Sequence, residues 1–165
     1  MDAYTPNRHR YALTIDARKF HHDTLESALN FYARYHYFDA QVKFLKDGVI
    51  HYASADGGES DDPSSWIQSV AKREQAQAVT YVGMARLLRV DGLPCKDDGK
   101  ILLAGYTLSP GRAAIINLFV LNLEGDELLI SEPEETAGLR GKEADLQLVS
   151  LKRHKADALL PDSYR

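Results

Sequence analysis

The most strongly patterned stretch of the chain is residues 113–130. An apolar run, a polar turn at Glu124-Gly125-Asp126 and an apolar return follow one another there. Two apolar runs joined by a short turn that contains glycine are typical of a β-hairpin. Both alternating sets of positions in the first run are apolar, which is typical of a strand with two buried faces. We therefore expect this hairpin to lie at the centre of a sheet.

The clearest helix is expected from Asp23 onward. Asp23 and Glu26 match a capping box, in which each side chain satisfies an unpaired backbone N–H. The residues at helical spacing that would form one buried stripe are Leu25, Ala28, Leu29, Tyr32, Tyr35 and Phe38. A β-prone run at 11–15 precedes this helix and is predicted to be the first strand.

A second hairpin is predicted around Asp47-Gly48, because this dipeptide between apolar runs suits a type I′ turn. Together with the first strand and the helix it would complete a βαββ unit over residues 10–55. A second helix is expected to begin at Asp62, as N-cap, with Pro63 in its first turn. Its apolar face would consist of Trp66, Ile67, Val70 and Ala71, and the pattern fades by residue 77.

The rest of the chain favours strands less clearly. Residues 79–90 are compatible with a long strand or with a helix, although Gly83 costs a helix about 1 kcal/mol. Residues 91–99 are expected to form a loop, and residues 101–108 a buried strand. Residues 143–160 remain open between strand and helix, with a strand favoured at its start. These elements predict an α+β fold in a single domain, residues 1–165: a mostly antiparallel sheet of about six to eight strands with two main helices packed on it.

Composition narrows the classes of protein. Of the 165 residues, 44% are hydrophobic and 27% are charged, which is ordinary for a folded domain. The net charge of −4 gives no electrostatic reason to expect a nucleic acid partner. Cys95 is the only cysteine, and neither a leader peptide nor a membrane-spanning apolar run is evident, so a cytoplasmic location is expected.

Four histidines are candidates for chemistry: His21, His22, His36 and His51. Their spacing lacks the H-x-x-x-H pattern of helical zinc sites, so no metal and no cofactor are expected. A catalytic site would need an Asp or Glu that the fold brings beside one of these rings. Whether the protein is an enzyme therefore remains open at this level.

Four residues are candidates for binding. Phe31, Arg34 and Tyr37 belong to an aromatic segment that holds more rings than one stripe can bury. Arg112, beside the Ser109-Pro110-Gly111 turn, could present a guanidinium to an anion. The first hypothesis is a non-catalytic protein of the bacterial-cytosol type that binds a protein partner, such as an inhibitor, an immunity or antitoxin-like protein, or an adaptor. The alternative is a small enzyme or ligand-binding domain whose His/carboxylate site forms only in the fold.

Overall fold

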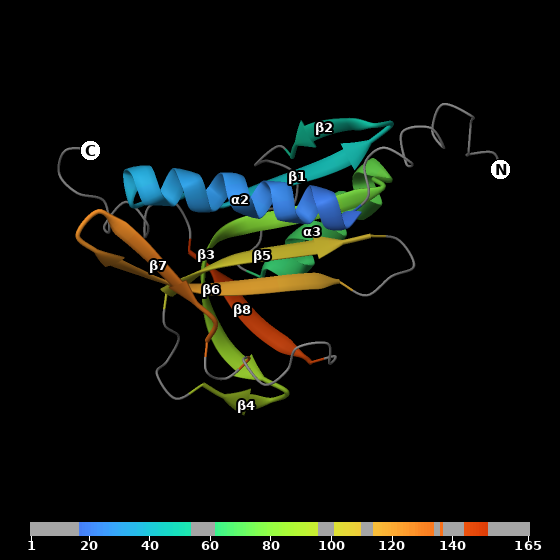
Figure 1. Cartoon of the computed structure of the whole chain (residues 1–165). Helices are drawn as coiled ribbons and strands as arrows, with labels where there is room; N and C mark the ends of the chain where they lie inside the picture. The colour runs from blue at the N-terminus through green and yellow to red at the C-terminus, as the bar shows by residue number, and fades with distance from the viewer. Residues whose placement is uncertain are drawn as a thin grey trace.

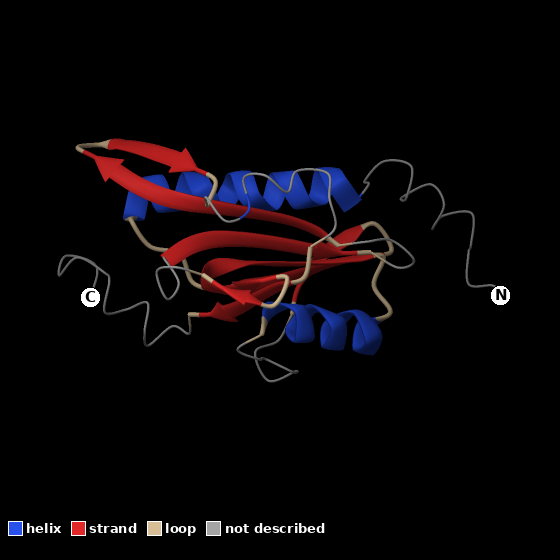
Figure 2. Cartoon of the chain, turned by 90° about the horizontal axis from the view of Figure 1, so that it is seen from below, coloured by secondary structure: helices blue, strands red, loops and turns tan. Residues whose placement is uncertain are grey.

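The computed structural model describes residues 17–53, 62–95, 101–109, 114–133, 136 and 144–151. In this part of the chain, two helices lie on opposite faces of one curled antiparallel sheet (Figures 1 and 2). The elements in order are α2 (Ala17–Tyr35), β1 (Gln41–Lys46), β2 (Val49–Tyr52), α3 (Pro63–Glu74), β3 (Ala78–Val90), β4 (Leu93–Pro94), β5 (Ile101–Leu108), β6 (Ile115–Glu124), β7 (Glu127–Ser131) and β8 (Leu146–Ser150). The α+β prediction is confirmed.

Strand β3 is the centre of the sheet, whose order is β2-β1-β3-β5-β6-β7. One edge of β3 pairs with β5, and its other edge pairs first with β1 and then with β8. Every residue from Ala78 to Ala85 is buried, as expected of a strand covered on both faces. Residues 79–90 thus belong to a strand, and residues 146–150 do too.

The predicted hairpin at 113–130 exists as β6 and β7, but its expected central position is wrong. Strand β6 is second from one edge of the described sheet and β7 is the edge itself. Most of β6 is only half-buried, and Leu118 is its one fully buried residue. Both faces of β6 are apolar because one face contributes to the core layer beneath α2 and the other to the layer beneath α3. The end of the hairpin projects beyond both helices (Figure 2).

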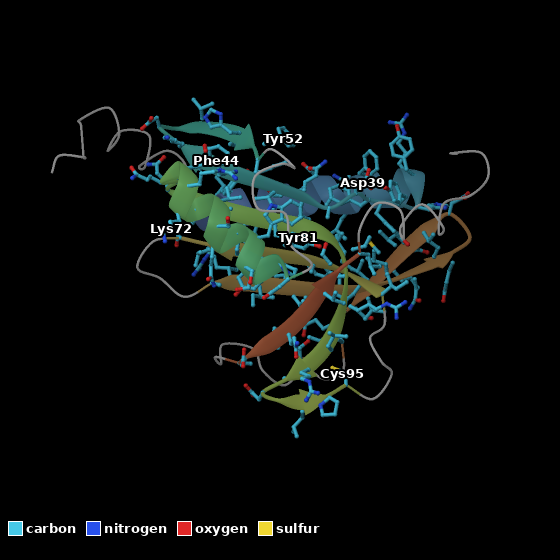
Figure 3. The ribbon with its side chains drawn as sticks, turned by 180° about the vertical axis from the view of Figure 1, so that it is seen from behind. Asp39, Phe44, Tyr52, Lys72, Tyr81 and Cys95 are labelled. Atoms are coloured by element: carbon cyan, nitrogen blue, oxygen red, sulfur yellow. The ribbon has the colours of Figure 1, made fainter. Side chains whose placement is uncertain are left out.

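Alternating residues of the strands form two core layers. The layer beneath α3 contains Trp66, Ile67 and Val70 of the helix together with Val79, Tyr81 and Leu102 of the sheet, among others. The layer beneath α2 contains Leu25, Ala28, Phe38, Val82, Met84, Leu103 and Leu151. Figure 3 shows Tyr81 in the first layer, where its ring lies 5.8 Å from that of Trp66.

Helix α2 begins at Ala17, six residues earlier than the capping box predicted. Asp23 lies inside the helix and forms an ion pair with Lys19, one turn before it, at 2.7 Å. The buried stripe extends back to Phe20, which packs against Leu45 of β1 and Ala78 of β3. This long-range contact, rather than a local cap, extends the helix towards its N-terminus. The strand predicted at 11–15 lies outside the described residues.

Local signals elsewhere are confirmed. Asp62 caps α3, because its carboxylate accepts hydrogen bonds from Ser64 N at 3.0 Å and Ser65 Oγ at 2.9 Å. Asp47 and Gly48 have φ values of 53° and 76°, as a type I′ turn requires. A second Asp-Gly turn follows β3 and leads into β4, so the loop predicted at 91–99 is partly a hairpin.

Candidate functional site

The four candidate histidines occupy different environments. His21 is buried beneath α2, whereas His22 is exposed beside it, with the two rings 5.4 Å apart. His36 follows the end of α2 in a left-handed conformation, with φ of 59°. His51, on β2, stacks on Phe44 at 5.0 Å. Among the described residues, no group of three or more His, Cys, Asp or Glu side chains could hold a metal ion.

His21 is the centre of a buried polar network that joins α2 to three strands. Its Nε2 lies 2.6 Å from Asn117 Oδ1 on β6, and its Nδ1 lies 2.6 Å from Thr107 Oγ1 on β5. The Thr107 hydroxyl is also 2.6 Å from Thr80 Oγ1 on β3. His21 has no exposed surface, and both threonines are almost fully buried.

The chemistry of these groups fixes the direction of the hydrogen bonds. Asn117 Oδ1 can only accept, so Nε2 carries the proton of the neutral ring and Nδ1 accepts from Thr107. The Thr107 oxygen then accepts from Thr80. Each of the four polar side chains in this network has a hydrogen-bond partner, which offsets the free-energy cost of burying it.

The network favours a neutral imidazole. Burial lowers the pKa of His21 below its ordinary value of 6.5, and nearby His22 lowers it further, while the hydrogen bond to Asn117 opposes this change. Its two partners are neutral side chains rather than carboxylates. The ring cannot touch a ligand while buried, so its role in this conformation is to fasten α2 to β5 and β6.

An exposed group of rings lies near the C-terminal end of α2. Phe31 is 43% exposed, although its ring packs 4.6 Å from Tyr35 and 5.7 Å from Phe38. The Arg34 guanidinium lies over the Tyr35 ring, 5.3 Å from its centre. Phe38 is buried and anchors the group to the core. We name Phe31, Arg34 and Tyr35 the aromatic surface.

The two other predicted binding residues do not join this surface. Tyr37 follows the end of α2 and is half-buried, with a fully buried hydroxyl that has no hydrogen-bond partner among the described residues. Of the two predicted binding rings of the aromatic segment, Phe31 is exposed and Tyr37 is half-buried. Arg112 lies outside the described residues.

The hairpin of β6 and β7 carries a second exposed surface, which sequence reasoning missed. Leu123, Leu129 and Ile130 are 36%, 40% and 49% exposed. The acids Glu124, Asp126 and Glu127 form the turn between the two strands and are all exposed. The expected position of the hairpin at the centre of the sheet gave no reason to predict exposed apolar side chains at its end. The acids around the turn were the available signal of an exposed end.

Comparisons with known proteins give no match. No protein-family model, no curated protein and no solved structure matches the chain. In the described part of the chain, no helix is long and apolar enough to cross a membrane. The aromatic surface, the projecting hairpin and the His21 network are therefore the features from which a function is inferred.

Proposed function

We propose that the protein is a non-catalytic binding protein that acts through protein–protein contacts at the aromatic surface. The observation that carries this proposal is the 43% exposure of Phe31 on a helix whose other large apolar side chains are buried or half-buried. Aromatic and arginine side chains contribute most of the binding energy at many protein interfaces. Phe31 and Arg34 supply both types within one turn of α2.

The surface is already ordered for binding. Phe31 is held between Tyr35 and the buried Phe38, so a partner would not have to immobilise a freely rotating ring. Fixing a side chain on association costs about 0.5–1.5 kcal/mol, and a pre-packed ring avoids part of that cost. Arg34 is likewise positioned by its contact with Tyr35.

The catalytic alternative has less support. It requires a histidine beside a carboxylate, and the one buried candidate, His21, bonds Thr107 and Asn117 instead. We further propose a cytoplasmic location, since the single cysteine, Cys95, suits a reducing compartment.

The test is photo-crosslinking in cell lysate, with a photoreactive phenylalanine analogue at position 31 and mass spectrometry of the captured species. Competition with unlabelled wild type should suppress the crosslink. Competition with Phe31→Ala or Arg34→Ala should be weaker, by about 30-fold for a residue that contributes 2 kcal/mol. Asn30→Ala, an exposed position of the same helix, is the matched control and should compete as well as wild type.

Circular dichroism should show that all three variants are folded. The proposal would be contradicted if mass spectrometry found no protein among the crosslinked species. It would also be contradicted if unlabelled Phe31→Ala suppressed the crosslink as well as unlabelled wild type does.

A further inference from the structure

Strand β7 forms one edge of the sheet that the described residues build. Among the described residues it pairs only with β6, through the register that runs from Glu124↔Glu127 to Val120↔Ser131. The two-residue turn makes Glu124 and Glu127 a hydrogen-bonded pair, and such pairs alternate along an antiparallel ladder. The backbone N–H and C=O groups of Leu128 and Ile130 therefore point away from β6.

The side chains along this edge are apolar on both faces of the strand. Ile130 is 49% exposed and points to the α2 side of the sheet, as does its partner on β6, Leu121. Leu129 is 40% exposed and points to the opposite side, and Leu128 is half-buried. A strand added to this edge could therefore place apolar side chains next to those of β7 on both faces of the sheet.

Acidic side chains stand at both ends of the apolar centre. Glu124, Asp126 and Glu127 lie at its start, and Glu132 follows its end; all four are exposed. The described residues of the hairpin from Ile115 to Ser131 include no lysine or arginine. A strand laid along β7 would meet negative charge at each end and apolar side chains between.

We propose that β7 accepts an extended segment of a partner protein as an additional strand, and that this segment is apolar at its centre and basic at both ends. Main-chain hydrogen bonds to Leu128 and Ile130 would supply affinity, as in other cases of strand addition. The acids would select lysine or arginine at the flanks. This inference rests on the proposed function, which makes the partner a protein. It assigns that protein a second point of contact.

A second copy of the chain fits this edge poorly. Antiparallel pairing of two β7 strands would bring Glu127 of each copy towards the Glu132 end of the other, and opposed like charges destabilise a strand pair. Charged residues at the ends of an edge strand also discourage such self-association. The opposite edge of the described sheet, β2, exposes Val49, Ile50 and Tyr52, but its neighbour β1 carries Lys43 and Lys46, so that edge is not uniformly acidic.

The test uses synthetic peptides and the full chain. The probe alternates valine and threonine and carries lysines at both ends; its matched control carries glutamates instead. Fluorescence anisotropy should detect binding of the lysine probe at least about tenfold tighter than the glutamate control, and the difference should shrink at high salt. Lysine substitutions at Glu124, Asp126 and Glu127 together should reverse the preference.

The hydrogen-bonding part is tested separately, from both sides. N-methylation of alternate residues removes the N–H groups along one edge of the peptide, and two such peptides cover its two edges. The peptide methylated on the edge that pairs with β7 should lose binding, and the peptide methylated on its outer edge should keep it. Ile130→Pro removes an outward N–H without breaking the ladder to β6 and should weaken binding at least about tenfold. Ile130→Thr, which keeps the N–H, should weaken it less. Circular dichroism confirms that both variants fold, and the methylated peptides test the same contact without any change to the protein.

Four outcomes would overturn the inference: equal binding of the lysine and glutamate peptides, equal loss with both methylated peptides, wild-type dimers that Ile130→Pro dissociates, or peptide binding only after removal of residues 152–165. The third would assign the edge to a second copy, and the fourth to the chain's own end. The crosslink at position 31 is measured independently, so its loss contradicts the proposed function and peptide failure contradicts only the strand addition.

Discussion

Leu25 of α2 occupies the space above Gly105 of β5: a Cβ placed on Gly105 would lie 2.7 Å from Leu25 Cγ. One helical turn earlier, His21 bonds Thr107, two residues further along the same strand. Four helical residues rise about 6 Å and two strand residues span about 6.8 Å, so the spacing of these two contacts is nearly the same along α2 and along β5. The helix and the strand run in opposite directions. Glycine at position 105 lets the helix approach this closely.

Gly105→Ala is expected to destabilise the protein by about 1–3 kcal/mol, because the added Cβ would overlap the buried Leu25 side chain and force it to shift. Leu25→Ala alone should cost about 2–5 kcal/mol through the cavity it leaves. The double variant should cost less than the sum of the two, as measured by urea unfolding. Strict additivity would show that the two side chains do not share this space.

The His21 network predicts a pH-dependent stability. Burial lowers the pKa of His21 in the folded state, so the unfolded chain binds more protons between pH 6.5 and the lowered pKa. The contribution of His21 is fully present above pH 6.5 and is lost as pH falls through that window. Urea unfolding from pH 7.5 to 5 should show this loss, and it should be smaller in His21→Gln, which does not titrate. An identical pH profile in the two proteins would assign the dependence to other groups.

The cap of α3 gives a local prediction. Asp62→Ala removes the acceptor for Ser64 N and Ser65 Oγ and should cost about 0.5–2 kcal/mol. Asp62→Asn keeps an acceptor oxygen at the same position and should retain most of the stability. Thermal unfolding of the three proteins separates these outcomes, and a variant with asparagine as unstable as the one with alanine would argue against capping.

A buried hydroxyl pair joins β3 to β8. Tyr81 Oη donates to the carbonyl oxygen of Met84 at 3.3 Å, so it accepts from Ser150 Oγ, which lies 2.7 Å away. Tyr81→Phe and Ser150→Ala should each destabilise by about 1–3 kcal/mol, because each leaves a buried polar group without its partner. The double variant should be less destabilised than the sum, since both partners are then absent. Chemical unfolding measures this coupling, and a coupling of zero would mean that the pair contributes nothing.

Burial raises the pKa of Tyr81, and the hydrogen bond to Ser150 only partly offsets this effect. Its phenol should therefore stay protonated at an alkaline pH above the ordinary tyrosine pKa of about 10. Ultraviolet titration of wild type and Tyr81→Phe should give the same amplitude until the protein unfolds. A difference at lower pH would mean that the ring is accessible to solvent.

The elements that sequence predicted correctly depend on short-range chemistry. Asp47-Gly48 requires positive φ at two adjacent residues, and Asp62 accepts from a backbone N–H and a hydroxyl two and three residues away, so neither depends on the rest of the fold. The position of β6 depends on which strands pair with it, and its two apolar faces are equally consistent with a centre or with a projecting hairpin. The beginning of α2 was misplaced for a similar reason, because Phe20 is buried by Leu45 and Ala78.

The candidate site residues likewise include some that short-range spacing predicts and others that depend on distant parts of the sequence. Phe31 and Arg34 could be found from the surplus of aromatic residues on one helix, since their neighbours are one turn away. Tyr37 lies after Tyr35, where α2 ends, so helical spacing does not predict the position of its ring. The His21 network could not be read from the sequence, because its ring partners are 86 and 96 residues distant.

The pairing of β3 has a consequence for how the protein forms during synthesis. Strands β1 and β8 lie end to end along one edge of β3, with Gln41 opposite Val82 and Ser150 opposite Ala85. The second half of β3 therefore has no neighbour on that edge until β8 has been made, although β1 is available much earlier. As the ribosome extends the chain, a partly paired β3 must wait for residues 146–150. Completion of the sheet is expected to follow translation of β8, the last of its described strands, rather than to proceed strand by strand.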